Sequence, residues 1–200
     1  MGHREALLVG AKRCLAEKGY ARTTARDIVA ASGTNLASIG YHFGSKEALL
    51  NQALIEAIGD WGTELARTLS THAVSDLEPM AQFEVIWTEI IALFAKHRQV
   101  LLASFEAISH VDHVPAVKEI LSSGLEQGRQ GLAQMFGTVA EGAGEAESRA
   151  VGSFYQALLT GLLAQWLIDP EHSPSGHDVA TALRIITARH RAGDLTEKSA

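Results

Sequence analysis

The stretch TTARDIVAASGTNLASIGYHFGSKEALL, residues 23–50, decides the fold of the N-terminal part of the chain. Thr23 or Thr24 can cap a helix that ends at Gly33, with Asp27 three residues after Thr24 in the place of a capping-box acid. Asn35 can cap a second short helix over residues 36–42. Two short helices joined by a tight turn have the form of a helix-turn-helix, although such pairs also occur in helical bundles without DNA. Spacing alone therefore leaves both interpretations open.

The second short helix has the residue types of a recognition helix. A helix that enters the major groove needs an apolar inner face and a small or polar outer face. Ile39 and Phe43 are four residues apart and supply the inner face, which Leu36 and Gly40 complete or flank. The residues expected to face outward are Ala37, Ser38, Tyr41 and His42. Ala37 and Ser38 are suited to base edges, and Ser38 also to a phosphate. Tyr41 and His42 are suited to phosphate oxygens.

Two residues outside that helix are expected to contact phosphate. Lys46 opens a long helix that Ser45 caps, and a cation at a helix N-terminus is poorly placed unless an anion lies nearby. Thr24 can offer its hydroxyl or its backbone N–H, in addition to its role as a cap.

These elements resemble the DNA-binding domain of the tetracycline-repressor (TetR) family of bacterial regulators. The similarity covers about residues 4–55 and is carried, in order, by Thr24, Arg26-Asp27-Ile28, Gly33, Tyr41-His42-Phe43 and Ser45-Lys46-Glu47-Ala48-Leu49. It implies that Arg26 reaches a base edge. The expected DNA contacts are therefore Thr24, Arg26, Asn35, Ala37, Ser38, Tyr41, His42 and Lys46. The chain departs from the family's commonest pattern at Gly40, where Tyr is usual, and glycine costs a helix about 1 kcal/mol relative to alanine.

The charge is divided between two predicted domains. Residues 1–50 carry seven Lys and Arg against four Asp and Glu, a net +3, whereas residues 51–200 carry a net −9. We expect a DNA-binding domain over residues 1–50 and a ligand-binding and dimerisation domain over residues 51–200. The predicted fold is all-α with about nine helices, of which the fifth begins near Asp76 and the sixth covers Gln99–Ser109.

Aromatic residues at helical spacing predict the interior of the larger domain. Such stripes are typical of ordinary core, but the resemblance implies a cavity for a small, largely apolar effector between the fourth to eighth helices. The residues expected to line it are Trp61, Phe83, Trp87, Phe94, Phe105, Phe154 and Tyr155. Ligand binding is expected to release the operator.

The last two helices are expected to form an isologous four-helix interface, since a palindromic operator needs two recognition helices about 34–36 Å apart. A core within one monomer is the alternative. The predicted interface residues are Gly152, Ala157, Gly161, Ala164, Val179, Leu183 and Ile186.

Other functional classes receive little support. The single Cys14 excludes an internal disulfide, and His110, Asp112 and His113 lack further ligands, so we expect no metal and no cofactor. No signal peptide is evident, and residues 157–168 are too short to span a bilayer, which favours a cytoplasmic protein without a membrane partner. The competing hypotheses are an all-helical enzyme, for which no nucleophile–base pair is found, and a protein-interaction module.

Overall fold

The fold is entirely helical in the part of the chain that the structure describes. The computed structural model describes residues 2–71, 76–109, 111–112, 115–137 and 144–197. These residues contain α1 (His3–Lys18), α2 (Ala25–Ser32), α3 (Leu36–Phe43), α4 (Lys46–Thr71), α5 (Pro79–Ile108), α6 (Pro115–Phe136), α7 (Glu145–Ile168) and α8 (Gly176–Glu197). The predicted all-α fold class is confirmed.

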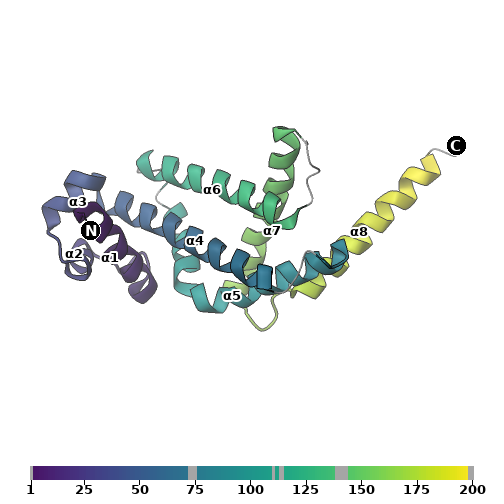
Figure 1. Ribbon diagram of the computed structural model, residues 1–200, viewed down its shortest axis with the longest axis horizontal. Helices are drawn as coiled ribbons and strands as arrows, with labels where there is room; N and C mark the ends of the chain where they lie inside the picture. The colour runs from purple at the N-terminus through teal and green to yellow at the C-terminus, as the bar shows by residue number, and fades with distance from the viewer. Residues whose placement is uncertain (1, 72–75, 110, 113–114, 138–143, 198–200) are drawn as a thin grey trace.

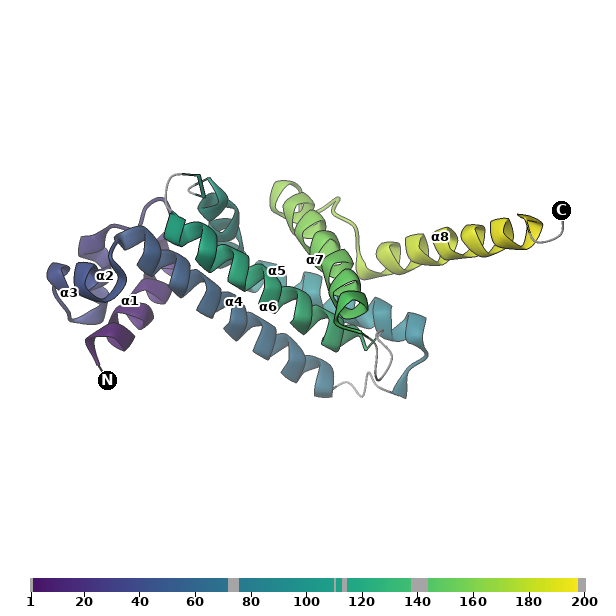
Figure 2. The same cartoon turned by 90° about the horizontal axis from the view of Figure 1, so that it is seen from above.

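The molecule is elongated, with α1, α2 and α3 gathered at one end (Figure 1). The long helices α4 and α5 connect this end to the rest of the chain, and α6 and α7 pack against them. Helix α8 projects from the opposite end, which both views show (Figures 1 and 2). The two ends of the molecule are therefore structurally distinct.

A first hydrophobic cluster holds α1, α2 and α3 against the start of α4. The apolar face of α1 is buried at the spacing that an amphipathic helix predicts, and Ile28 of α2 and Ile39 of α3 close the cluster. Val100, Ala103 and Ala107 of α5 belong to the same cluster. The N-terminal helices therefore rest on α5 as well as on α4.

A second hydrophobic cluster lies between α4, α5, α6, α7 and the start of α8. The stripe Phe83, Trp87, Ile90 and Phe94 of α5 is buried along its length and forms the centre of the cluster. Helix α4 contributes to both clusters, since Leu49 and Leu54 belong to the first and Leu65 to the second. Helices α4 and α5 are thus shared by the two packing units.

The fifth and sixth predicted helices are one helix. α5 runs unbroken for 30 residues, so the described residues contain eight helices and not nine. After Pro79 the segment holds no proline or glycine that would end a helix, and both of its halves have a packing partner. The expected break before Gln99 was therefore wrong.

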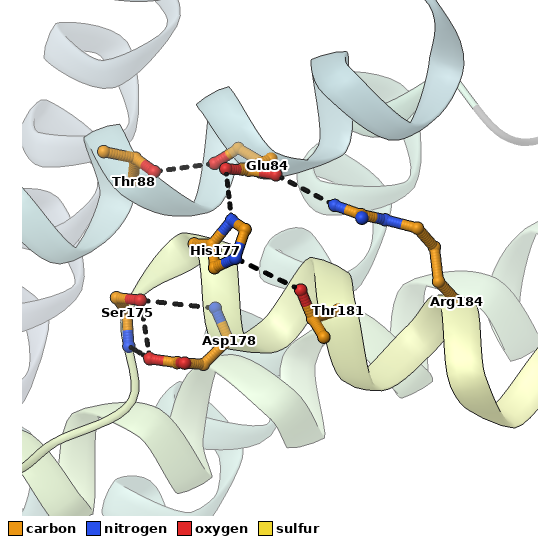
Figure 3. Close-up of polar contacts among 7 residues, drawn as sticks. All are labelled: Glu84, Thr88, Ser175, His177, Asp178, Thr181 and Arg184. Carbon is orange, nitrogen blue, oxygen red and sulfur yellow. Dashed lines mark hydrogen bonds and ion pairs between the residues drawn. The ribbon is translucent and has the colours of Figure 1, made fainter.

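A polar junction fixes the start of α8 against α5 (Figure 3). The Ser175 hydroxyl accepts a hydrogen bond from the backbone N–H of Asp178 at 3.2 Å, and the Asp178 carboxylate accepts one from the backbone N–H of Ser175 at 2.9 Å. The Glu84 carboxylate pairs with His177 Nδ1 at 2.9 Å and with Arg184 at 3.2 Å. These contacts set the direction in which α8 leaves the molecule.

Candidate nucleic-acid interface

The start of α2 is held by a capping box, as predicted. The Thr24 hydroxyl oxygen accepts from the Asp27 backbone N–H at 3.2 Å, and the Thr24 backbone N–H donates to the Asp27 carboxylate at 2.9 Å. Lys18 at the end of α1 donates to the same carboxylate at 2.6 Å. Hydrogen bonds from Lys18 and Thr24 hold the pKa of Asp27 well below its usual value. The orientation of α2 is therefore fixed relative to α1.

The turn between α2 and α3 is closed by backbone geometry and a side-chain cap. Gly33 has a left-handed backbone with φ of 65°, which glycine adopts without strain. The Asn35 side chain accepts from the Ser38 backbone N–H at 3.0 Å. This arrangement presents α3 at a defined angle, as a helix-turn-helix requires.

Ser38 faces inward, contrary to expectation. Its side chain is 8% exposed, and its hydroxyl donates to Asn35 Oδ1 at 3.2 Å. Ile39 beside it is buried as predicted, and Phe43 is partly buried. His42 was expected to face outward but is also partly buried, on the same side as Ser38. The inner face of α3 thus consists of residues 38, 39, 42 and 43.

The outer face of α3 consists of Leu36, Ala37, Gly40 and Tyr41, which are all exposed. Ala37 and Tyr41 were expected there, and Tyr41 is 86% exposed. Leu36 and Gly40 were expected on or beside the inner stripe, and this expectation was wrong. The Asn35 cap accepts from the Ser38 hydroxyl and so holds the Ser38 side chain inward. Relative to the predicted orientation, α3 is therefore turned by about one residue, roughly 100°.

The fourth helix begins with a cap and a lysine that has partners of its own. The Ser45 hydroxyl accepts from the Ala48 backbone N–H at 3.0 Å. Lys46 Nζ donates to the Thr23 carbonyl oxygen at 3.3 Å and lies 3.4 Å from the Glu47 carboxylate. These contacts account for a cation at a helix N-terminus without DNA, so that part of the argument for a phosphate contact does not hold.

Two further basic or ring-bearing residues lie beside α3 and were missed by the sequence reasoning. The Arg4 guanidinium stands 5.2 Å from the ring centroid of Phe43, and His3 Nδ1 lies 3.5 Å from the Ser38 hydroxyl. Both belong to the exposed first turn of α1, ahead of its first buried residue. Arg26 is also exposed, on α2, and pairs with no other residue in the described part of the chain. His3 and Arg4 thus lie against Ser38 and Phe43 on the inner face of α3.

The predicted effector-binding residues mostly meet in the second cluster. Trp61, Phe83, Trp87, Phe94 and Tyr155 are buried there and Phe105 is partly buried against it. Phe154 is 53% exposed, so the expectation that it faces the interior was wrong. Phe154 precedes Tyr155 directly, and consecutive residues of a helix point about 100° apart.

The predicted interface residues divide into two groups. Ala157, Gly161 and Ile186 are exposed, and Ala164 is half-buried. Gly152, Val179 and Leu183 instead pack within the chain. A Cβ atom at Gly152 would collide with the Arg129 carbonyl oxygen, so the close approach of α6 and α7 explains this glycine. No group of three potential metal ligands occurs among the described residues, and His110 and His113 lie outside them.

Comparison with known proteins agrees with this geometry. A family profile described as "Bacterial regulatory proteins, tetR family" matches residues 7–53, which include α2, α3 and the capped start of α4. Residues 7–53 are therefore similar to the DNA-binding domain of the tetR family. The chain is 23% identical over 176 residues to the transcriptional regulator TtgR of Pseudomonas putida, covering 84% of this chain and 81% of that protein. It is 46% identical to the repressor AcnR of Corynebacterium efficiens over 46 residues, 23% of this chain and 24% of that protein.

Solved structures share the fold over most of this chain. The multidrug binding protein EbrR, in complex with proflavin, superposes with a TM-score of 0.63 at 20% identity, over 91% of this chain and 99% of that one. A transcriptional regulator from Pseudomonas aeruginosa superposes with a TM-score of 0.62 at 18% identity, over 95% and 90%. At these identities the likeness establishes the fold.

Proposed function

We propose that this chain is a one-component transcription regulator of the TetR type that binds a palindromic operator through α3. The observation that carries the proposal is the exposed face formed by Leu36, Ala37, Gly40 and Tyr41, on a helix whose angle is fixed by the Asn35 cap. A small, largely neutral face of this kind fits the major groove. Repression is the favoured outcome, because the AcnR relatives are named as repressors.

The contacts divide by chemistry. The Leu36 and Ala37 side chains can pack on thymine methyl groups, and Arg26 can form two hydrogen bonds with a guanine. Tyr41 is suited to a phosphate oxygen. Lys46 and the N-terminus of α2 at Thr24 lie together, since Lys46 donates to the carbonyl of the residue before Thr24. We expect this pair to bind one phosphate.

The deciding experiment measures binding of DNA that flanks the gene, by fluorescence anisotropy across a range of salt concentrations. Lys46→Ala is expected to weaken binding to all sequences and to lower the slope of log K against log salt by about 1. Arg26→Ala is expected to reduce discrimination between operator and scrambled DNA at least as strongly as affinity. Arg67→Ala is the matched control, because Arg67 is exposed on α4 near the end of that helix that lies away from α3 (Figure 1).

The result that would contradict the proposal is binding that is not selective for sequence at any salt concentration. It would favour the protein-interaction alternative. Unchanged affinity and selectivity in both variants would be compatible with a transcription regulator, but would refute the proposed DNA contacts of Lys46 and Arg26.

We infer that two copies associate through α7 and α8. Phe154, Ala157, Gly161 and Ile168 follow one another at helical spacing on α7, and all four are exposed. By length and composition α7 could cross a membrane, yet only 22% of its most apolar window is buried within the chain. With Ile185 and Ile186 exposed on α8, this surface supports an isologous four-helix interface.

The second cluster is the proposed effector site, and the aromatic residues of α4, α5 and α7 are its lining. We propose that the effector binds there without being converted, and that it favours an arrangement of the dimer in which the two α3 helices no longer match the groove spacing. The EbrR structure was solved with proflavin bound, which supports an aromatic effector in this fold. Because DNA is the target, we place the protein in the cytoplasm. Thermal-shift screening of metabolites and antibiotics tests the site, and each hit should lower operator affinity.

A further inference from the structure

Two hydrogen-bond donors are buried without acceptors in the second cluster. The indole Nε1 atoms of Trp61 on α4 and Trp87 on α5 have no hydrogen-bond partner in the described part of the chain. The side chains are 6% and 0% exposed, so bulk water does not reach them freely. An indole N–H can only donate, and a buried donor without an acceptor costs free energy that most folded proteins avoid. Such donors indicate a place where an acceptor can bind.

The surroundings of the Trp87 ring are aromatic. The ring of Trp87 lies 5.4 Å from that of Phe136, centroid to centroid. Phe136 in turn stacks on Tyr155 at 4.0 Å with an angle of 17° between the ring planes. Three helices, α5, α6 and α7, therefore contribute ring faces to one layer. A planar ligand can replace one ring-to-ring contact with another at little cost.

One carboxylate on each of the same two helices is already paired. Glu64 of α4 accepts from Lys96 at 2.5 Å and from His97 Nε2 at 3.1 Å. Glu84 of α5 pairs with His177 and Arg184 in the junction of Figure 3. Neither carboxylate is left to select a cation, which favours a neutral ligand.

We propose that the effector is a neutral planar aromatic compound whose ring nitrogen or carbonyl oxygen accepts hydrogen bonds from Trp61 and Trp87. This inference rests on the proposed function, because it assigns a chemical class to the proposed effector site. Hydrophobic area holds the ligand in the cluster, and the two N–H groups select acceptor-bearing rings over plain hydrocarbons.

The test uses ligands of nearly equal shape. Naphthalene has no acceptor, quinoline has one ring nitrogen and 1,5-naphthyridine has two. The indole N–H signals of the ¹⁵N-labelled full chain report the contact, and single Trp→Phe variants assign them. Quinoline and 1,5-naphthyridine are expected to move the Trp61 and Trp87 indole protons downfield, and naphthalene is not.

Affinities provide the second measurement. In Trp61→Phe and in Trp87→Phe, the affinity for 1,5-naphthyridine relative to naphthalene is expected to fall about fivefold, the contribution of one hydrogen bond. Naphthalene corrects for the smaller ring of the variants. Trp166→Phe is the matched control and should leave the ratio unchanged. N-methylquinolinium, which is charged and lacks an acceptor, should bind more weakly than quinoline.

Three results would overturn the inference. The first is that neither quinoline nor 1,5-naphthyridine binds at any concentration up to its solubility limit. The second is that naphthalene causes the same shifts of the indole N–H signals. The third is that N-methylquinolinium binds more tightly than quinoline. Shifts that naphthalene reproduces would indicate that ring faces already satisfy the indole groups. Operator binding is measured on the same preparation to separate these results from failure of the proposed function. Selective DNA binding without a preference for acceptor-bearing ligands would refute only this inference. A preference for such ligands without DNA binding would refute only the proposed regulator function.

Discussion

Tyr20 illustrates how single residues hold the N-terminal helices together. It is buried where α1 leads into α2, and its hydroxyl oxygen accepts from the Asn51 side-chain amide at 2.9 Å. Asn51 is itself fully buried on α4 and also donates to the Glu47 carbonyl oxygen at 2.7 Å. This contact joins the loop after α1 to α4. Burial raises the pKa of the Tyr20 phenol to about 12.

This raised pKa makes stability depend on alkaline pH. The unfolded phenol ionises near pH 10 and the folded one near 12, so the stabilisation present below pH 10 is lost as pH rises to 12. The loss is about 1.4 kcal/mol per pH unit. Tyr20→Phe should lower the free energy of unfolding by about 1 kcal/mol at pH 8. Between pH 8 and pH 11 the free energy of unfolding of the variant should then fall less steeply than that of wild type. Urea unfolding at both pH values measures this.

Tyr41→Phe is the control for that experiment, because Tyr41 is exposed on α3. Its unfolding free energy should follow wild type at both pH values. Parallel curves for Tyr20→Phe and wild type would show that burial of this phenol does not govern the alkaline response.

At the scale of elements, α6 and α7 touch where no side chain intervenes. A Cβ atom at Gly152 would meet the carbonyl group of Arg129, which belongs to the backbone and cannot rotate away. Gly152→Ala should therefore lower the unfolding free energy by about 1–3 kcal/mol, the usual cost of overpacking. Gly131→Ala on α6 is the control: its Cβ would meet nothing, and it should raise stability by up to about 1 kcal/mol. Thermal unfolding of both variants decides.

Gly40 makes stability and DNA binding separable within α3. It lies in the exposed face and has open space around it. Gly40→Ala should raise the unfolding free energy by about 0.5–1 kcal/mol. Because the added methyl group would stand between α3 and the groove, operator affinity should fall at the same time. An increase in both quantities would place Gly40 away from the DNA.

The elements differ in how far the sequence predicts them. Caps are local, so Asn35 and Ser45 were assigned correctly, and Thr24 as one of two candidates, from neighbours within three residues. The orientation of α3 is not local: it depends on the inward Ser38 hydroxyl and on contacts with α1, which no periodicity over eight residues resolves. The continuity of α5 depends on packing partners at both ends, which lie far apart in sequence.

At the scale of the whole molecule, the exposed stripe of α7 determines the predicted assembly. Phe154 and Ile168 are 53% and 84% exposed, and Gly161 between them permits close helix packing. Phe154→Asp should convert a dimer of twice 21.4 kDa into a folded monomer and abolish operator binding at concentrations where wild type is saturated. Light scattering coupled to size-exclusion chromatography measures the mass.

Leu125→Asp is the control for the assembly, because Leu125 is an exposed apolar residue of α6 that lies outside the proposed surface. Its mass should match that of wild type. If the Phe154→Asp variant remains a dimer, the interface lies on another surface of the molecule. The interface proposed from the structure uses the same two helices as the sequence prediction but other residues of α7, since burial against α6 removes Gly152 from the available surface.

The unbroken α5 has a mechanical consequence. Its first half carries Phe83 and Trp87, and near its end Glu106 accepts a hydrogen bond from the Ala21 backbone N–H at 3.0 Å, directly before the capped start of α2. Thirty helical residues extend about 45 Å. Because α5 has no break along that length, a displacement of one end of the helix is expected to move the other end with it. In the proposed dimer, effector binding and the separation of the two α3 helices should therefore change together.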